Sequence, residues 1–395
     1  MSFLKEAYLS FKEEVLSLKY NSLPLMAAIV LPIAAWTVLA LTFSDGDISE
    51  LPFTVVDNDK SALSREIISR LDATKYLEVK AVIANEEDAR QMLANGEIYF
   101  IVYLPKDMEE SVKRSKYSKV EVLSNGAYLV YSKAGYKAIA QALFDISKNI
   151  QVKRLTDKGL TNRLANERAM PIVTEIRTKG NPYFEYASYL IPGMVFVIFQ
   201  MSASFSAMWM FRDKTLHESH VNVPSFGKKL PVFTGRLAFI VTINYMPLIL
   251  VFTFIFPLAG VPAGEYYGNL LLLGILYMFV SIGLGMGISF LILDLATASQ
   301  VLLVLNAMTF IFSGYTFPIY GMPDFLIPVT KIIPLTHFLD SYFEVFIFGR
   351  LTPVNLLPFI IYGAILWLVN GLFIIFGHKI FRQKSKHSRI AALNI

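Results

Sequence analysis

The stretch LPLMAAIVLPIAAWTVLAL, Leu23 to Leu41, decides the class of this protein. It is free of charged residues, and its length of about 19 matches the ~20 apolar residues with which a helix crosses a bilayer. The preceding MSFLKEAYLSFKEEVLSLKYNS is long and carries charges of both signs, which is atypical of a secretory signal. Val38-Leu39-Ala40 could pass as a cleavage site, but the long mixed-charge start favours an uncleaved membrane span.

Composition supports a membrane protein with several spans. The chain is 54% hydrophobic and only 17% charged, whereas soluble domains carry roughly 25% charged residues. Further apolar runs lie at 187–211, 237–260, 268–293, 296–317 and 355–378. The absence of cysteine excludes disulfides, cysteine zinc sites and thiol nucleophiles. Because the net charge of +5 comes from short segments that flank apolar runs, we expect no nucleic-acid partner.

Basic residues predict the orientation of the chain. Lys and Arg gather in the N-terminal tail, in the 212–236 loop and in the C-terminal tail. Six spans place these three regions on one side, and the positive-inside rule makes that side cytoplasmic. We therefore expect a multi-pass protein of the cell (inner) membrane with both termini in the cytoplasm.

The predicted fold class is an α-helical polytopic membrane protein with six transmembrane helices, a re-entrant helical hairpin and one α/β extracytoplasmic domain. The predicted parts are a cytoplasmic amphipathic interfacial helix at 1–22, transmembrane helix one at 23–43, an extracytoplasmic domain at 44–186, transmembrane helices two to six within 187–378, and a basic cytoplasmic tail at 379–395.

The segment 44–186 has the composition of a water-soluble domain. It carries 21 basic and 21 acidic residues, and strand-like and helix-like segments alternate along it up to a long helix at 129–168 and a return strand, PIVTEIR. That order predicts an α/β or α+β fold. Asp57 and Asp59 suit turn and helix-capping roles better than metal binding, and the segment contains no histidine.

The N-terminal tail predicts an amphipathic helix over residues 3–20. Its apolar residues recur at spacings of three and four, opposite lysines and a glutamate: Phe3, Leu4, Ala7, Tyr8, Phe11, Val15 and Leu18 against Lys5, Lys12, Glu13 and Lys19. Such a helix either lies on the membrane surface or packs on its own protein. The pattern favours neither.

Catalytic and metal motifs are few. The chain lacks the phosphate-binding G-x-x-x-x-G-K-[ST] and the nucleophile elbow G-x-S-x-G, so we expect neither enzymatic activity nor a cofactor of its own. The sequence HESH, His217 to His220, is one residue short of the zinc motif H-E-x-x-H and lacks a third ligand. A contact surface is the better interpretation, and we predict no metal site.

Polar residues within the fifth apolar run recur at helical spacing. Gln300, Asn306 and Ser313 could line one face of a transport pathway. Helix–helix hydrogen bonds explain them equally well. No span carries an Asp or Glu at mid-membrane, which disfavours a proton-coupled pump.

The segment SGYTFPIYGMPDFLIPVTKIIPLTHFLD, Ser313 to Asp340, is apolar but carries four prolines. Each proline removes a backbone donor and clashes with the preceding turn, so one straight helix is excluded. If this segment were a further span, the basic C-terminal tail would lie outside the cell, against the positive-inside rule. We expect 319–350 to form two short helices that dip into the outer leaflet and return, with Pro334 near the bend.

The longer stretch FIFSGYTFPIYGMPDFLIPVTKIIPLTHFLDSYFEVFIFG resembles the signature region of type-2 ATP-binding-cassette (ABC) exporter permeases. The matching residues are Ser313-Gly314, Pro318, Met322-Pro323, Pro334-Leu335-Thr336 and Gly349. The layout is similar to the subclass with a large extracytoplasmic domain between spans one and two. The resemblance in sequence covers about 310–350, and the resemblance in architecture covers nearly the whole chain.

This resemblance implies a coupling helix between spans two and three. Thr215-Leu216, Pro224 and Gly235-Arg236 fit the family's pattern, while Lys214 stands in place of a glycine and His217 in place of a glutamate. The coupling residues that it implies are Arg212, Asp213, Thr215, His217, Glu218, Lys228 and Arg236. The residues assigned to an outer gate in 319–350 and just before it are Phe317, Pro318, Met322, Pro323, Pro334, His337 and Glu344.

The resemblance further implies a permease subunit that exports an amphipathic or hydrophobic substrate. ATP and Mg would bind at a cytoplasmic ABC ATPase subunit. Other expected partners are a second copy or paralogue of the permease, membrane lipid and, where an outer membrane exists, a periplasmic adaptor. The alternative is a membrane-anchored receptor or scaffold whose extracytoplasmic domain binds a partner. Co-purification with an ATPase separates the two.

Overall fold

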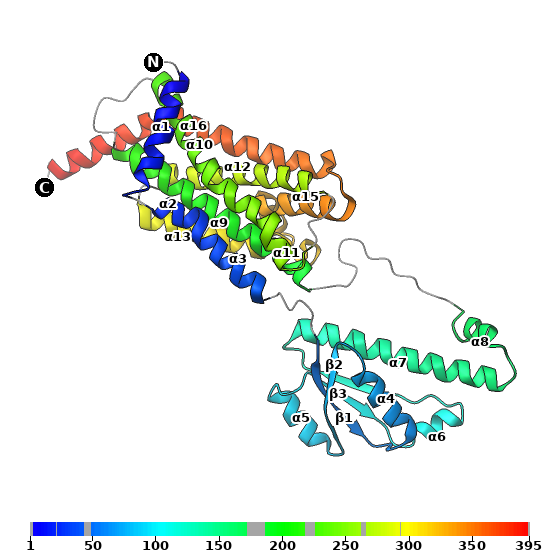
Figure 1. Ribbon diagram of the computed structural model, residues 1–395. Coiled ribbons are helices and arrows are strands. Elements are labelled where there is room, and N and C mark those ends of the chain that lie inside the picture. Colours follow the sequence, from blue (N-terminus) through cyan, green and yellow to red (C-terminus); the bar gives the residue numbers. More distant parts are fainter. Residues whose placement is uncertain are drawn as a thin grey trace. The chain divides into compact units, whose positions relative to one another are not determined.

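The computed structural model describes residues 3–20, 22–42, 49–171, 186–217, 226–261, 266–292 and 294–393 (Figure 1). The chain forms two compact units. We call Met1–Gly46 together with Thr178–Ile395 the membrane unit, and Asp47–Arg177 the sheet unit.

The membrane unit is helical, and its described residues contain six helices long and apolar enough to cross a bilayer, as predicted. They are Leu23–Thr42, Tyr189–Phe211, Leu230–Leu258, Tyr267–Leu291, Leu295–Phe312 and Pro353–Ile374. The elements of this unit are α1 (Phe3–Ser17), α2 (Leu23–Leu25), η1 (Met26–Val30), α3 (Leu31–Thr42), α9 (Tyr186–His217), α10 (Phe226–Leu250), η3 (Val251–Ile255), α11 (Phe256–Leu258), α12 (Tyr267–Leu291), α13 (Leu295–Phe312), η4 (Ile319–Gly321), α14 (Ile327–Ile332), α15 (Pro334–Phe348) and α16 (Pro353–Leu393).

Helices α9 and α12 form the centre of the membrane unit. At Gly285 of α12 a Cβ atom would lie 1.9 Å from the backbone oxygen of Ser204 in α9, so the two backbones touch. Small residues allow such approach between membrane helices, where dispersion contacts replace the hydrophobic effect. The first span joins this centre through Trp36, whose Nε1–H donates to the Val195 carbonyl of α9 at 3.2 Å.

Residues 49–171 of the sheet unit form a four-stranded sheet in the order β2-β1-β3-β4, with helices on its faces. Strands β1 (Leu51–Asp57), β2 (Leu77–Ile83) and β3 (Phe100–Leu104) are parallel, and β4 (Glu121–Ser124) is antiparallel to β3. The helices of the unit are α4 (Ala62–Asp72), α5 (Glu86–Ala94), α6 (Met108–Lys113), α7 (Leu129–Asp157) and α8 (Asn162–Ala169). α4 and α7 close the main core on one face of the sheet, and α5 packs on the other.

The two aspartates after β1 act as turn and capping residues, as the sequence predicts. Asp57 accepts hydrogen bonds from the backbone N–H of Asp59 and Lys60 and from the Ser64 hydroxyl. Asp59 accepts from the backbone N–H of Met108 and Glu109 at 2.8 and 3.1 Å. Both carboxylates are therefore committed to ordering the turn and the start of α6.

Three predicted boundaries are corrected. The single helix expected at 129–168 is two helices, because Gly159 takes a φ of +92° and ends α7. The fifth apolar run ends as a helix at Phe312 and not at 317, and the third span begins at Leu230, ahead of 237. The return strand PIVTEIR lies outside the described residues, apart from its first residue.

Candidate functional site

Helix α1 packs along the first half of α10. The Ser10 hydroxyl donates to the Val232 carbonyl at 3.1 Å, and the rings of Phe11 and Phe239 meet edge to face. A Cβ on Gly235 would lie 2.2 Å from the Ala7 carbonyl oxygen, so no other residue fits there without a shift. One face of the N-terminal helix therefore packs on its own protein; these contacts do not concern its opposite face, and a location on the membrane surface stays a prediction.

A buried ion pair lies at the centre of this contact. Arg236 Nε is 3.2 Å from Glu14 Oε1, and the two side chains are 8% and 4% exposed. Burying charge is costly unless it is paired, so this pair fixes the register between α1 and α10. The sequence assigns Arg236 to the coupling loop, whereas its described ion pair is with Glu14 inside the protein. Glu14 was missed, although it shares a helix face with Ala7 and Ser10.

The other coupling residues lie around the short interval between α9 and α10. The predicted loop 212–236 is largely helical, because α9 continues to His217 and α10 begins at Phe226. Arg212, Asp213, Thr215 and His217 lie on the last turns of α9, and Lys228 lies on the first turn of α10; the structure describes the backbone at these positions. Glu218 lies outside the described residues.

The Ser-Gly step of the predicted signature forms a tight turn at the end of α13. Gly314 has a φ of +84°, a conformation that side chains disfavour, and Ser313 Oγ accepts the Tyr315 N–H at 3.3 Å. The turn directs the Tyr315 ring onto α9, where Gly193 leaves room for it. There the ring stacks with Tyr189, at 5.0 Å between centroids, and with Phe343 of α15.

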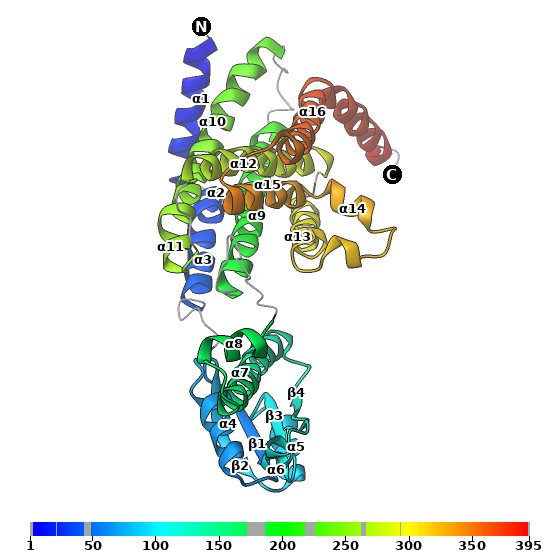
Figure 2. The same ribbon diagram turned by 90° about the vertical axis from the view of Figure 1, so that its right-hand side faces the viewer.

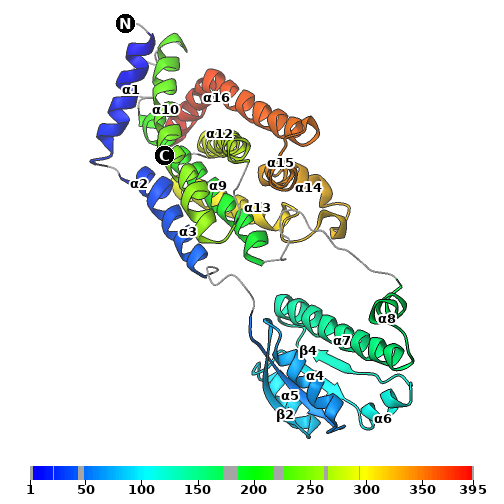
Figure 3. The same ribbon diagram turned by 45° about the vertical axis from the view of Figure 1, so that its right-hand side comes forward.

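After this turn the chain forms two helices with a break between them, as predicted. The break falls at Ile333, whose extended backbone precedes Pro334, the first residue of α15; a residue before proline is pushed out of the helical region. α15 lies against α12, α14 and α16 (Figure 3). Its Phe338 ring is 4.4 Å from that of Phe196 and 4.2 Å from that of Tyr277, so α15 is anchored in the aromatic core.

Two of the predicted gate residues join elements. His337 Nε2 lies 2.8 Å from the Lys331 carbonyl oxygen and links α15 to the end of α14. Glu344 accepts the Thr352 N–H at 3.1 Å and the Asn355 amide at 3.0 Å. Glu344 therefore caps the start of α16, which leaves it less free for a direct role on substrate.

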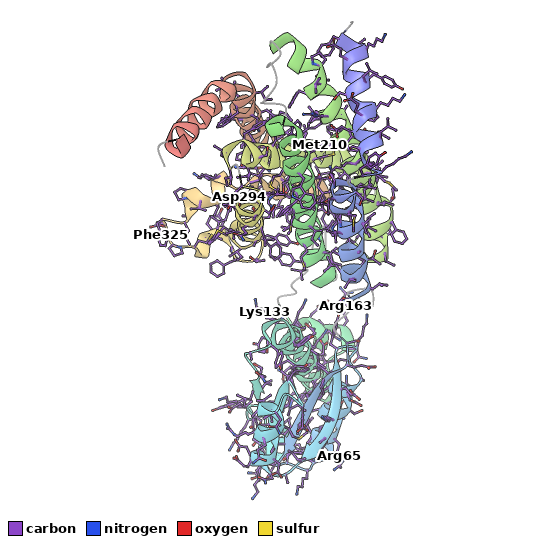
Figure 4. All side chains as sticks on the ribbon, turned by 90° about the vertical axis from the view of Figure 1, so that its left-hand side faces the viewer. Arg65, Lys133, Arg163, Met210, Asp294 and Phe325 are labelled. Carbon is purple, nitrogen blue, oxygen red and sulfur yellow. The ribbon has the colours of Figure 1, made fainter. Side chains whose placement is uncertain are left out.

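The aromatic and proline residues of the predicted gate divide into exposed and buried members. Phe317 is 52% exposed and Met322 is 9% exposed. Pro318 and Pro323 flank the short helix η4, and Pro334 lies at the break described above. Phe325 was not among the predicted gate residues. It is 75% exposed, and it lies at the outer edge of the membrane unit (Figure 4).

Buried polar side chains tie α9, α12 and α13 together. Tyr277 OH donates to Gln200 Oε1 at 2.7 Å, and Gln200 Nε2 donates to Asn306 Oδ1 at 2.8 Å. Asn306 Nδ2 donates in turn to the Leu302 carbonyl and to Ser204 Oγ. Such a network satisfies polar groups that would be costly alone in hydrocarbon. The side-chain partners of Asn306, Gln200 and Ser204, lie on α9, about a hundred residues away in the chain, so the sequence pattern could not pair them.

The three residues predicted to line a pathway do not share one exposed face of α13. Asn306 and Ser313 are 1% and 4% exposed, whereas Gln300 is exposed beside Val301 and Val304. Helix–helix hydrogen bonding, the alternative kept open for these residues, describes Asn306. Within the described residues no three His, Asp or Glu side chains gather as a metal site.

Six candidate spans within the described residues, with the anchored α14–α15 segment between the last two, define a polytopic helical membrane protein. The model of the ABC-2 family transporter proteins matches residues 25–376. The chain belongs to this family. It is also 24% identical over 368 residues to the probable multidrug ABC transporter permease YbhS of Escherichia coli strain K12, and equally to that of strain O157:H7. These matches cover 87% of this chain and 89% of the relative.

Proposed function

We propose that this chain is the membrane-embedded half of an ATP-driven exporter, working with a separate cytoplasmic ABC ATPase and a second permease copy or paralogue. ATP and Mg act at the ATPase. The substrate is an amphipathic or hydrophobic compound that leaves towards the outer leaflet. Membership of the ABC-2 family supports the transport role, and the relative named as a probable multidrug permease supports the substrate class.

The observation that carries the proposal is the packing of α15. The signature-like segment is built into the aromatic core through Phe338 and into α9 through Tyr315. Residues 319–350 in this proposal form the re-entrant outer gate. Movement of α9 would reach this segment directly, because Gly193, which receives the Tyr315 ring, belongs to the same helix as Arg212 and His217.

The remaining assignments of this proposal follow from the distribution of charge. Both termini and the 212–236 region lie in the cytoplasm of a cell whose inner membrane holds the six spans. The sheet unit lies outside, where it receives substrate or contacts a periplasmic adaptor. Basic residues in the three cytoplasmic segments and the balanced charge of the sheet unit support this orientation.

Reconstitution tests the proposal. The permease is purified with the ATPase that accompanies it, and uptake of a fluorescent amphipathic dye is measured in inverted vesicles. ATP-dependent uptake that disappears with a hydrolysis-deficient ATPase is the expected result. Replacing Arg212 or Glu218 should lower dye-stimulated ATP hydrolysis while the complex stays assembled.

Other results would redirect the assignment. Unchanged coupling in both variants would remove the 212–236 region from the mechanism. Uptake driven by a proton gradient without ATP would indicate a proton-coupled pump. A permease that never co-purifies with an ATPase would favour the receptor or scaffold.

A further inference from the structure

Helix α1 buries polar side chains and exposes apolar ones. Ser10 and Glu14, 4% and 3% exposed, face α10, whereas Leu4 is 78% and Tyr8 64% exposed. Val15, Leu16 and Leu9 are exposed as well. In water these exposed apolar side chains would gain no stabilisation from the hydrophobic effect. The outer face of α1 is therefore more stable in an apolar environment. Figure 2 shows α1 running beside α10.

The same outer face carries a row of lysines. Lys5 and Lys12 are exposed and lie seven residues apart on α1, and Lys19 is exposed in the turn directly after the helix. Residues seven apart on a helix differ in direction by only ~20° and lie about 10 Å apart along the axis. The row lies between Leu4, Tyr8 and Val15 on one side and Leu9 and Leu16 on the other. Glu6 and Glu13 lie about a third of a turn away from the lysines.

We propose that the outer face of α1, which carries Lys5 and Lys12 with their apolar neighbours, binds the anionic headgroups of membrane lipids together with Lys19 in the turn after the helix. Lysine stems extend along apolar surface and place the ammonium among phosphates. Each lysine near an anionic bilayer favours binding by about fivefold, so three give on the order of a hundredfold. The first span begins at Leu23, only a few residues after Lys19, which holds this end of α1 at the membrane surface.

A lipid surface fits this face better than a protein does. Protein–protein interfaces are depleted in lysine, especially at their centre, whereas here lysines occupy the middle of the apolar face. The buried Glu14–Arg236 pair and the Ser10–Val232 hydrogen bond join α1 to α10. Lipid bound to α1 therefore steadies the beginning of α10. This consequence for transport rests on the proposed function, while the lipid contact itself does not.

Spin labelling tests the lipid contact, because the chain contains no cysteine and each introduced cysteine is the single labelling site. A nitroxide is placed at Y8C in the permease alone, without ATPase, in nanodiscs of phosphatidylcholine or of phosphatidylcholine mixed with phosphatidylglycerol. Accessibility to oxygen and to a water-soluble nickel chelate is measured. With phosphatidylglycerol the label should become several times less accessible to nickel and more accessible to oxygen. A label at Y117C, in a loop position of the sheet unit that is 94% exposed, should show no change.

Charge variants identify the lysines as the cause. K5Q/K12Q/K19Q should abolish the effect of phosphatidylglycerol, and K5R/K12R/K19R should retain it. K116Q/K133Q/K153Q removes three exposed lysines of the sheet unit and should retain it too. A Y8C label equally nickel-accessible in both lipids, or an effect that survives K5Q/K12Q/K19Q, overturns the proposal. A further outcome also overturns the proposal: in phosphatidylcholine alone, the Y8C label loses nickel accessibility only after the ATPase is added. That result would assign the outer face of α1 to the ATPase. A transport-inactive permease leaves all these readings unaffected, so failure of the proposed function is recognised separately.

Discussion

Removing one partner of the Glu14–Arg236 pair should destabilise the membrane unit strongly. The Nε to Oε1 distance is 3.2 Å, and the two side chains are 8% and 4% exposed. A charge left alone at this site has little access to water. Loss of one partner from a buried pair costs about 3–5 kcal/mol, whereas replacing both by apolar side chains is often neutral or stabilising. We therefore expect E14M and R236M each to lose about 3–5 kcal/mol of unfolding free energy, and E14M/R236M to lose far less.

The assay is unfolding of the purified chain in mixed micelles with increasing dodecyl sulfate, followed by circular dichroism. The double-mutant cycle isolates the coupling of the pair, provided that neither single change creates new contacts. The exposed pair of Arg90 and Glu86, 2.7 Å apart, supplies the control. R90M should leave the unfolding free energy nearly unchanged, because exposed pairs contribute little. Single variants that cost less than about 1 kcal/mol, or a coupling near zero, would refute the reasoning.

The remaining predictions concern the polar network, the signature turn and the capped turn. Q200L leaves Tyr277 OH and Asn306 without their partner and should cost about 1–2 kcal/mol in the same assay; Q300L, at an exposed position, should cost nothing, and equal losses would argue against the network. G314A forces a side chain onto a φ of +84° and should cost about 1–2 kcal/mol; G371A, with open space around it, is the control, and a neutral G314A would contradict the geometry. D59A should lower the unfolding free energy by about 1 kcal/mol and speed amide hydrogen exchange at Met108 and Glu109. The control D88A should leave this exchange unchanged, and unaltered exchange in D59A would exclude the capping role.

Sequence reasoning predicted those features that local patterns determine. The length of the uncharged runs indicated the six spans, and alternating strand and helix segments indicated the mixed α and β organisation of the sheet unit. The prolines located the break before Pro334. Each of these depends on residues close together in the chain, where backbone sterics and hydropathy act without distant partners.

Features that depend on distant partners could not be predicted. The network pairs Gln200 with Asn306 and Tyr277 across three helices, and only the packed fold brings them together. Arg236 belongs by sequence to a charged loop, yet it pairs with Glu14 from the first helix. The start of the third span was placed too late, because Arg236 interrupts the apolar pattern while α10 continues through it.

The contact of Gly285 with Ser204 determines which parts of the membrane unit can move independently. Two backbones that touch at a point where even a methyl group has no room cannot rotate about their axes without a collision. α9 and α12 therefore behave as one rigid body. α13 and α16 have only 22% and 17% of the residues in their most apolar windows buried, and they are the least buried of the candidate spans in the described part of the chain.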